Sequence, residues 1–137
     1  MICDNVEQPR RMTKGSSCYD FYSPDDYEIK PGRVTRIDTG VRLTDLDICN
    51  DFPRWAMCLF PRSSFGMQYG MRFSNTIGII DMDYRDNIKA SITSDVPFRL
   101  KKGERFMQGM IIPFGILNGE IEPTDERVGG IGSTGRK

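Results

Sequence analysis

The chain has 137 residues, and its 19 lysine and arginine residues balance its 19 aspartate and glutamate residues, so its formal net charge is zero. This length suits one domain with its own core, and the zero balance excludes an overall field that would favour nucleic acid or an anionic membrane as a partner. The chain has no histidine, which removes the commonest general base and transition-metal ligand. Any catalysis must therefore rest on carboxylates, hydroxyls, arginines or a hard metal ion.

No apolar run approaches the roughly 18 residues that span a bilayer, and the N-terminus shows no signal-peptide pattern. We therefore expect a cytoplasmic protein without a membrane partner, or one of the host cytoplasm or nucleus if its source is a virus. The cysteines, at positions 3, 18, 49 and 58, have no metal-motif spacing, and we expect free thiols.

Short stretches with the period of a β-strand recur between turns that contain glycine and proline. Residues 1–17 predict a loosely held entry segment, and residues 124–137 cannot pack as a core element. We expect one helical turn, at residues 63–70, where a serine hydroxyl caps the start and Gly70 closes the end. With 14 glycines and 8 prolines, the pattern indicates an all-β barrel or sandwich. The predicted strands are residues 36–43, 55–60, 75–80, 88–93, 96–101, 106–114, which is expected to be buried on both faces, and a short one near residues 119–123.

Three stretches carry polar groups that suit a binding site. Residues 61–64 (PRSS) offer an arginine and hydroxyls to an anion, but they also fit a plain helix cap. Residues 132–137 (GSTGRK) can wrap a polyphosphate, but they also fit a disordered C-terminus. An apolar strand ends in residues 81–85 (DMDYR), where Asp81 can orient and deprotonate a water; the structural alternative is an acid pair at a hairpin with Arg85 as its ion-pair partner.

The order of such stretches along the chain is informative. The chain carries, in turn, residues 18–21 (CYDF), 61–64 (PRSS), 78–85 (GIIDMDYR), 103–108 (GERFMQ) and 129–135 (GGIGSTG). In order and spacing they resemble the motifs of the trimeric deoxyuridine triphosphate nucleotidohydrolases, the dUTPase family. The resemblance runs from about residue 18 to the end of the chain, and the second and third motifs are its most specific parts.

This resemblance implies a β jelly-roll barrel over residues 1–123 and a flexible arm, residues 124–137, that closes over the active site of a neighbouring subunit. It implies a homotrimer with active sites at the subunit interfaces. The implied reaction is Mg²⁺-dependent hydrolysis of dUTP to dUMP and pyrophosphate, which limits uracil incorporation into DNA and supplies dUMP for thymidylate synthesis.

By position, the resemblance assigns catalysis to Asp81, which would activate the water that attacks the α-phosphorus, and a structural role to Asp83. Phosphates and waters would hold Mg²⁺, and Asp20 would reach the ion through a water. Tyr84 would pack under the deoxyribose. The other implied substrate-binding residues are Asn75, Gly78 and Ile80 for uracil, Arg62, Ser63, Ser64, Gly66 and Gln108 for the phosphates, and Arg127, Ile131, Gly132, Ser133 and Thr134 in the arm.

The chain departs from the family pattern at several positions. Ile131 stands where a phenylalanine normally stacks on uracil, so the base would lose a π-face contact. Only Val128 separates Arg127 from the paired glycines, which leaves the γ-phosphate contact open between Arg127 and Arg136. The family's usual glycine, lysine and glycine are replaced, respectively, by Cys18, Gln68 and Asp86.

Two alternatives remain in view. A dCTP deaminase shares the implied fold and an arginine-serine-serine turn, but it would need a glutamate base, and the surroundings of Asp81 fit water attack on phosphorus better. A catalytically weak nucleotide-binding or regulatory member of the same fold is the second alternative. The joint presence of Asp81, Asn75, Tyr84 and residues 62–64 speaks against it, because a scaffold would not need that set.

Overall fold

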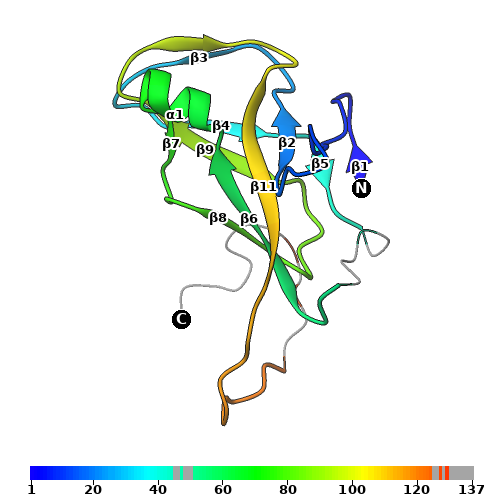
Figure 1. Ribbon diagram of the computed structural model, residues 1–137. Helices are drawn as coiled ribbons and strands as arrows, with labels where there is room; N and C mark the ends of the chain where they lie inside the picture. The colour runs from blue at the N-terminus through cyan, green and yellow to red at the C-terminus, as the bar shows by residue number, and fades with distance from the viewer. Residues whose placement is uncertain (45–46, 48–50, 125–126, 128, 130–137) are drawn as a thin grey trace.

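The computed structural model of the protein describes residues 1–44, 47, 51–124, 127 and 129. Short antiparallel strands and a short helix make up the described chain (Figure 1), which confirms the predicted all-β class. No helix in these ranges is long and apolar enough to cross a membrane. In chain order the elements are β1 (Ile2–Cys3), β2 (Tyr19–Tyr22), β3 (Tyr27–Ile29), β4 (Thr35–Asp38), β5 (Val41–Arg42), β6 (Trp55–Pro61), α1 (Ser63–Tyr69), β7 (Arg72–Phe73), β8 (Gly78–Asp81), β9 (Lys89–Thr93), β10 (Phe98–Leu100) and β11 (Arg105–Pro113).

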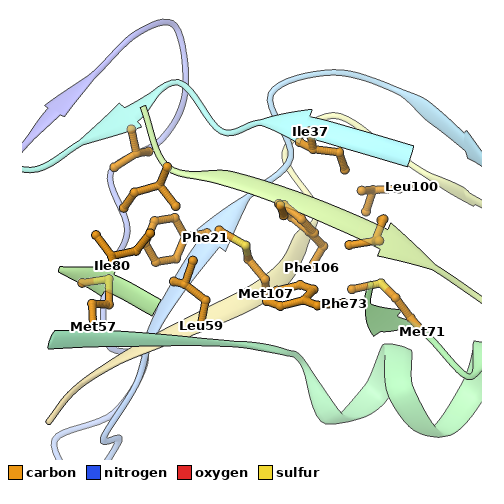
Figure 2. Packing of buried hydrophobic residues seen from close by; sticks show 14 of the residues in the cluster. Phe21, Ile37, Met57, Leu59, Met71, Phe73, Ile80, Leu100, Phe106 and Met107 are labelled. Atoms are coloured by element: carbon orange, nitrogen blue, oxygen red, sulfur yellow. The ribbon is translucent and has the colours of Figure 1, made fainter. Parts of the chain in front are cut away.

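The core lies between two antiparallel sheets. The larger sheet has the strand order β2-β11-β6-β8, and the smaller one has the order β4-β9-β7. Figure 2 shows side chains of both sheets meeting in one cluster, with Phe21 and Met107 from the larger sheet and Ile37 and Phe73 from the smaller one. Burial of this apolar set is the main favourable term that holds the sheets together.

The two faces of the larger sheet differ in character. Leu59 and Met57 of β6 face the core and are almost fully buried. Because successive side chains of a strand point to opposite faces, Ala56 and Phe60 lie on the outer face. The register places Asp81 opposite Ala56, and Gln108 opposite Phe60, so both predicted site residues share that outer face.

Three predictions about strands need correction. Residues 36–43 do not form one strand, because the chain turns between β4 and β5 at Gly40, whose φ is 69°. The strand near residues 119–123 is wrong: that segment pairs with nothing in the described chain, and Ile121 is 96% exposed. β11 is buried only in its first half, since Phe106 is fully buried while Pro113 is exposed.

Candidate active site

A polar pocket of about 390 Å³ lies beside the start of α1 and the neighbouring strands β2 and β11. The register of the sheet pairs Gln108 of β11 with Asp20 of β2, so two predicted site residues from distant parts of the sequence stand side by side. Arg62 and Ser63 join them because they follow β6 directly. The pocket is lined by Ser16, Ser17, Asp20, Arg62, Arg105 and Gln108, among others.

Asp20 is nearly buried between two arginines, with 10% of its side chain exposed. Arg105 Nη1 donates a hydrogen bond to Asp20 Oδ2 at 3.0 Å, and Arg62 Nε lies 3.8 Å from the same oxygen. Arg62 Nη1 also donates to the main-chain carbonyl of Arg105 at 3.1 Å. With two guanidinium groups and one carboxylate, the pocket has the charge and the donors to receive phosphate oxygens.

Arg105 lines the pocket but is not among the site residues that the sequence predicts. It stands three positions before Gln108, and a regular strand places residues three apart on opposite faces. A β-bulge between Arg105 and Met107 shifts the register, so that Arg105 pairs with Tyr22 while Gln108 pairs with Asp20. The extra residue turns Arg105 onto the face that carries Asp20 and Gln108. In the sequence it is a charge at the head of an apolar strand, inside the motif stretch of residues 103–108, which gives it no role of its own.

Helix α1 has the predicted place but not the predicted cap. Its N-cap is Arg62, which makes no side-chain cap hydrogen bond, so the expected serine cap is wrong. Ser63 and Ser64 are instead the first two residues of the helix, where both are exposed, and Gly66 is its fourth residue. Gly70 closes the helix in the left-handed conformation, with φ of 61°, as predicted.

Among the predicted uracil-reading residues, Asn75 lies in the turn between β7 and β8, two strands of different sheets, while Gly78 and Ile80 lie on β8 itself. Asn75 accepts a hydrogen bond from the amide of Ile77 at 2.8 Å across Thr76, which has a φ of 69°. A positive φ is unusual for a β-branched residue, so this tight turn is strained. The side chain of Ile80 is buried in the core, which leaves its main chain as the part that can meet a ligand.

Asp81 is the last residue of β8, and its side chain is 52% exposed. Arg127 binds it through Nη2 and binds Asp83 through Nε at 2.9 Å. The Arg127 guanidinium also lies 5.8 Å from the centre of the Tyr84 ring. Within this chain Arg127 therefore neutralises the predicted catalytic carboxylate and covers the ring that was expected to meet the sugar.

Tyr84 is buried, and its hydroxyl donates a hydrogen bond to the carbonyl of Asn87 at 2.9 Å. Burial raises the pKa of the Tyr84 hydroxyl, so it stays protonated at neutral pH. The arm residues Ile131, Gly132, Ser133 and Thr134 lie outside the described residues, as does Arg136.

The pocket and Asp81, at the end of β8, lie far apart within one chain. Asp20 is in the row of Gln108 and Phe60, whereas Asp81 is opposite Ala56, which lies four residues before Phe60 on β6. The strand of Asp81, β8, is three strands away from β2 in the sheet. With ordinary strand rise and spacing, the two main chains are roughly 20 Å apart. A single small substrate cannot reach both groups of the same chain.

These features describe an all-β protein with a cationic pocket and an exposed carboxylate at the end of β8. The model of the dUTPase family matches residues 4–135, and the chain belongs to this family. It is 34% identical over 138 residues to the deoxyuridine 5'-triphosphate nucleotidohydrolase of Actinobacillus succinogenes, with 94% of this chain and 87% of that protein covered.

The enzyme of the same name from Neisseria meningitidis is 34% identical over 137 residues, covering 93% of this chain and 87% of that protein. The crystal structure of dUTPase from Streptococcus mutans is similar with a TM-score of 0.70 and 26% identity, over 87% of this chain and 98% of that one. These likenesses confirm the jelly-roll fold that the motifs implied.

Proposed function

We propose that this protein hydrolyses dUTP to dUMP and pyrophosphate, as the names of its relatives describe for them. One observation carries the proposal beyond the family assignment. A pocket with two guanidinium groups and the exposed carboxylate at the end of β8 lie on the same face of one sheet, yet too far apart to act on one substrate in one chain.

The separation leads to a shared active site. If the pocket of one subunit faces the end of β8 of another subunit, the Asp81 carboxylate and the phosphates meet across an interface. Beyond β11 the chain runs away from both sheets (Figure 1, orange) and exposes Phe114, Ile116, Leu117 and Ile121, which is a surface suited to packing on a neighbouring copy. A homotrimer that shares its sites in this way fits both observations.

In this scheme each group has one task. Asp81 accepts a proton from a water molecule and orients that water for attack on the α-phosphorus. Pyrophosphate leaves on the side opposite to the attack. Arg62, Ser63, Ser64, Gly66 and Gln108 hold the phosphates. Asn75, Gly78 and Ile80 recognise uracil through their main chains, and Tyr84 excludes a 2′-hydroxyl. Arg127 or Arg136 contacts the γ-phosphate, and Ile131, Gly132, Ser133 and Thr134 cover the nucleotide.

Mg²⁺ fits this residue set as an ion that the substrate carries. No cluster of three acidic or thiol ligands occurs among the described residues, and in the proposed scheme phosphates and waters hold the ion. Asp20 suits a water-mediated contact because it lines the pocket and only its Oδ2 is taken by the arginines. When bound, the ion neutralises charge on the phosphates.

A product assay tests the proposal against its alternatives. Purified protein is incubated with Mg²⁺ and either dUTP or dCTP, and the products are separated. Release of pyrophosphate from dUTP supports the proposal, whereas deamination of dCTP without it would establish a deaminase. Asp81→Asn should still bind dUTP but hydrolyse it about 10³-fold more slowly. An unchanged rate would remove Asp81 from its role.

A further inference from the structure

The contacts of Asp20 are unequal, and this inequality suggests a role for Arg105. Arg105 makes a true hydrogen bond to Asp20 Oδ2 at 3.0 Å, while the Nε of Arg62 stands 3.8 Å from that oxygen, beyond hydrogen-bond length. A carboxylate that is only 10% exposed needs a close counter-charge. Arg105 supplies it, so Asp20 does not depend on Arg62.

Arg105 also controls Arg62 through its main chain. Its carbonyl accepts a hydrogen bond from Arg62 Nη1 at 3.1 Å, which holds the second guanidinium at the pocket wall. The bulge in β11 makes both contacts possible, because it turns the Arg105 side chain onto the face of Asp20. One residue therefore neutralises the acid and orients the other cation.

We propose that Arg105 is a positioning residue of the phosphate site, whose ion pair with Asp20 keeps Arg62 available to the substrate. This inference rests on the proposed function and assigns a residue that the family motifs left without a role. When a triphosphate enters, Arg62 is free to contact a phosphate oxygen, and Arg105 stays paired with Asp20. Without Arg105, Asp20 captures Arg62, and phosphate must compete with a carboxylate for it.

Direct binding tests this exchange without catalysis. The probe is the non-hydrolysable α,β-imido-dUTP in EDTA, measured by calorimetry, so no metal enters the comparison. Arg105→Met should weaken binding about tenfold, and Arg105→Gln, which keeps the polar shape but not the charge, should do the same. Arg105→Lys should restore most of the affinity. Arg99→Met is the matched control, because it breaks an exposed pair with Asp26 outside the pocket.

The decisive comparison repeats Arg105→Met in an Asp20→Asn background. With no carboxylate to capture Arg62, the loss caused by Arg105→Met should fall from about tenfold to less than about twofold. An undiminished loss would overturn the proposal, since Arg105 would then act on phosphate directly or through the field of the pocket. If neither Arg105→Met nor Arg105→Gln weakens binding in the wild-type background, the proposal is overturned as well.

Inorganic tripolyphosphate separates this inference from the proposed function. The same variants should show the same pattern with tripolyphosphate, which has no base or sugar. If the wild-type protein binds tripolyphosphate with this pattern but the product assay with Mg²⁺ shows no dUTP hydrolysis, the proposed function fails and the role of Arg105 stands. A wild-type protein that binds neither probe in EDTA would overturn the role of Arg105, while the product assay with Mg²⁺ alone decides the proposed function.

Discussion

Gly78 links the packing of the core to the position of the proposed catalytic acid. It begins β8 and pairs with Leu59 of β6 on the core face. A Cβ atom at position 78 would lie 3.0 Å from Leu59 Cβ and 3.1 Å from Leu59 Cδ1. The first of these atoms is fixed to the backbone, so β6 or β8 must shift in a Gly78→Ala variant. Asp81 stands three residues further along the same short strand.

The expected loss of stability follows from these contacts. Overpacking a core costs about 1–3 kcal/mol, and alanine regains about 0.5–1 kcal/mol of the backbone entropy that glycine loses in a strand. Mid-range values leave a net loss of about 1 kcal/mol, which should lower the Tm by about 3–4 °C for a chain of this size. A displaced Asp81 should also lower kcat about tenfold.

The assay is thermal unfolding at one fixed protein concentration, because assembly makes the Tm depend on concentration. Gly15→Ala serves as the control for stability, since a Cβ atom there would meet nothing within 4 Å. A Gly78→Ala protein that melts with the wild type would refute the reasoning, and so would an equal shift in the Gly15→Ala control.

Three further changes test other parts of the molecule. The Lys102 amide and the Arg99 guanidinium lower the pKa of the Asp26 carboxyl; its stabilisation is therefore present near neutral pH and lost as the pH falls through the lowered pKa, so the Tm difference between Asp26→Asn and wild type should shrink steadily in acid, and a difference that does not change with pH would contradict the ion pair. Deleting residues 125–137 should abolish most dUTP hydrolysis while the circular dichroism spectrum stays unchanged, and loss of the fold would contradict a separate arm. Ile131→Phe should tighten nucleotide binding by calorimetry; no gain would mean that residue 131 does not cover the base.

Period-two patterns predicted much of the sheet because half of each strand faces the core. β6, β9 and β10 lie where alternation or a continuous apolar run placed them. The prediction failed at Gly40, where the carbonyl of Asp4 would lie 2.8 Å from a Cβ atom. The Asp4 amide also donates to the Gly40 carbonyl at 2.7 Å, and a contact between such distant residues leaves no mark on local alternation.

The site was predictable where motif residues lie on regular strands. Asp20 and Gln108 were expected together, and the register of β2 and β11 places them opposite each other. Arg105 was missed because a bulge, which periodicity cannot anticipate, moves it to their face. The sequence also does not predict the contact of Arg127 with Asp81, because it joins the arm to the end of β8, and the two residues are 46 positions apart.

The central claim is that active sites are shared between subunits, and subunit mixing tests it most directly. One variant, Asp81→Asn, lacks the carboxylate at the end of β8. The other, Arg62→Ala with Gln108→Ala, lacks two side chains of the phosphate pocket. Each should be nearly inactive with dUTP alone. The two variants are mixed in equal amounts, unfolded together and refolded as mixed trimers. About a quarter of the sites should then combine an intact pocket with an intact Asp81 and recover that share of wild-type activity. A mixture no more active than its two parts would contradict the account.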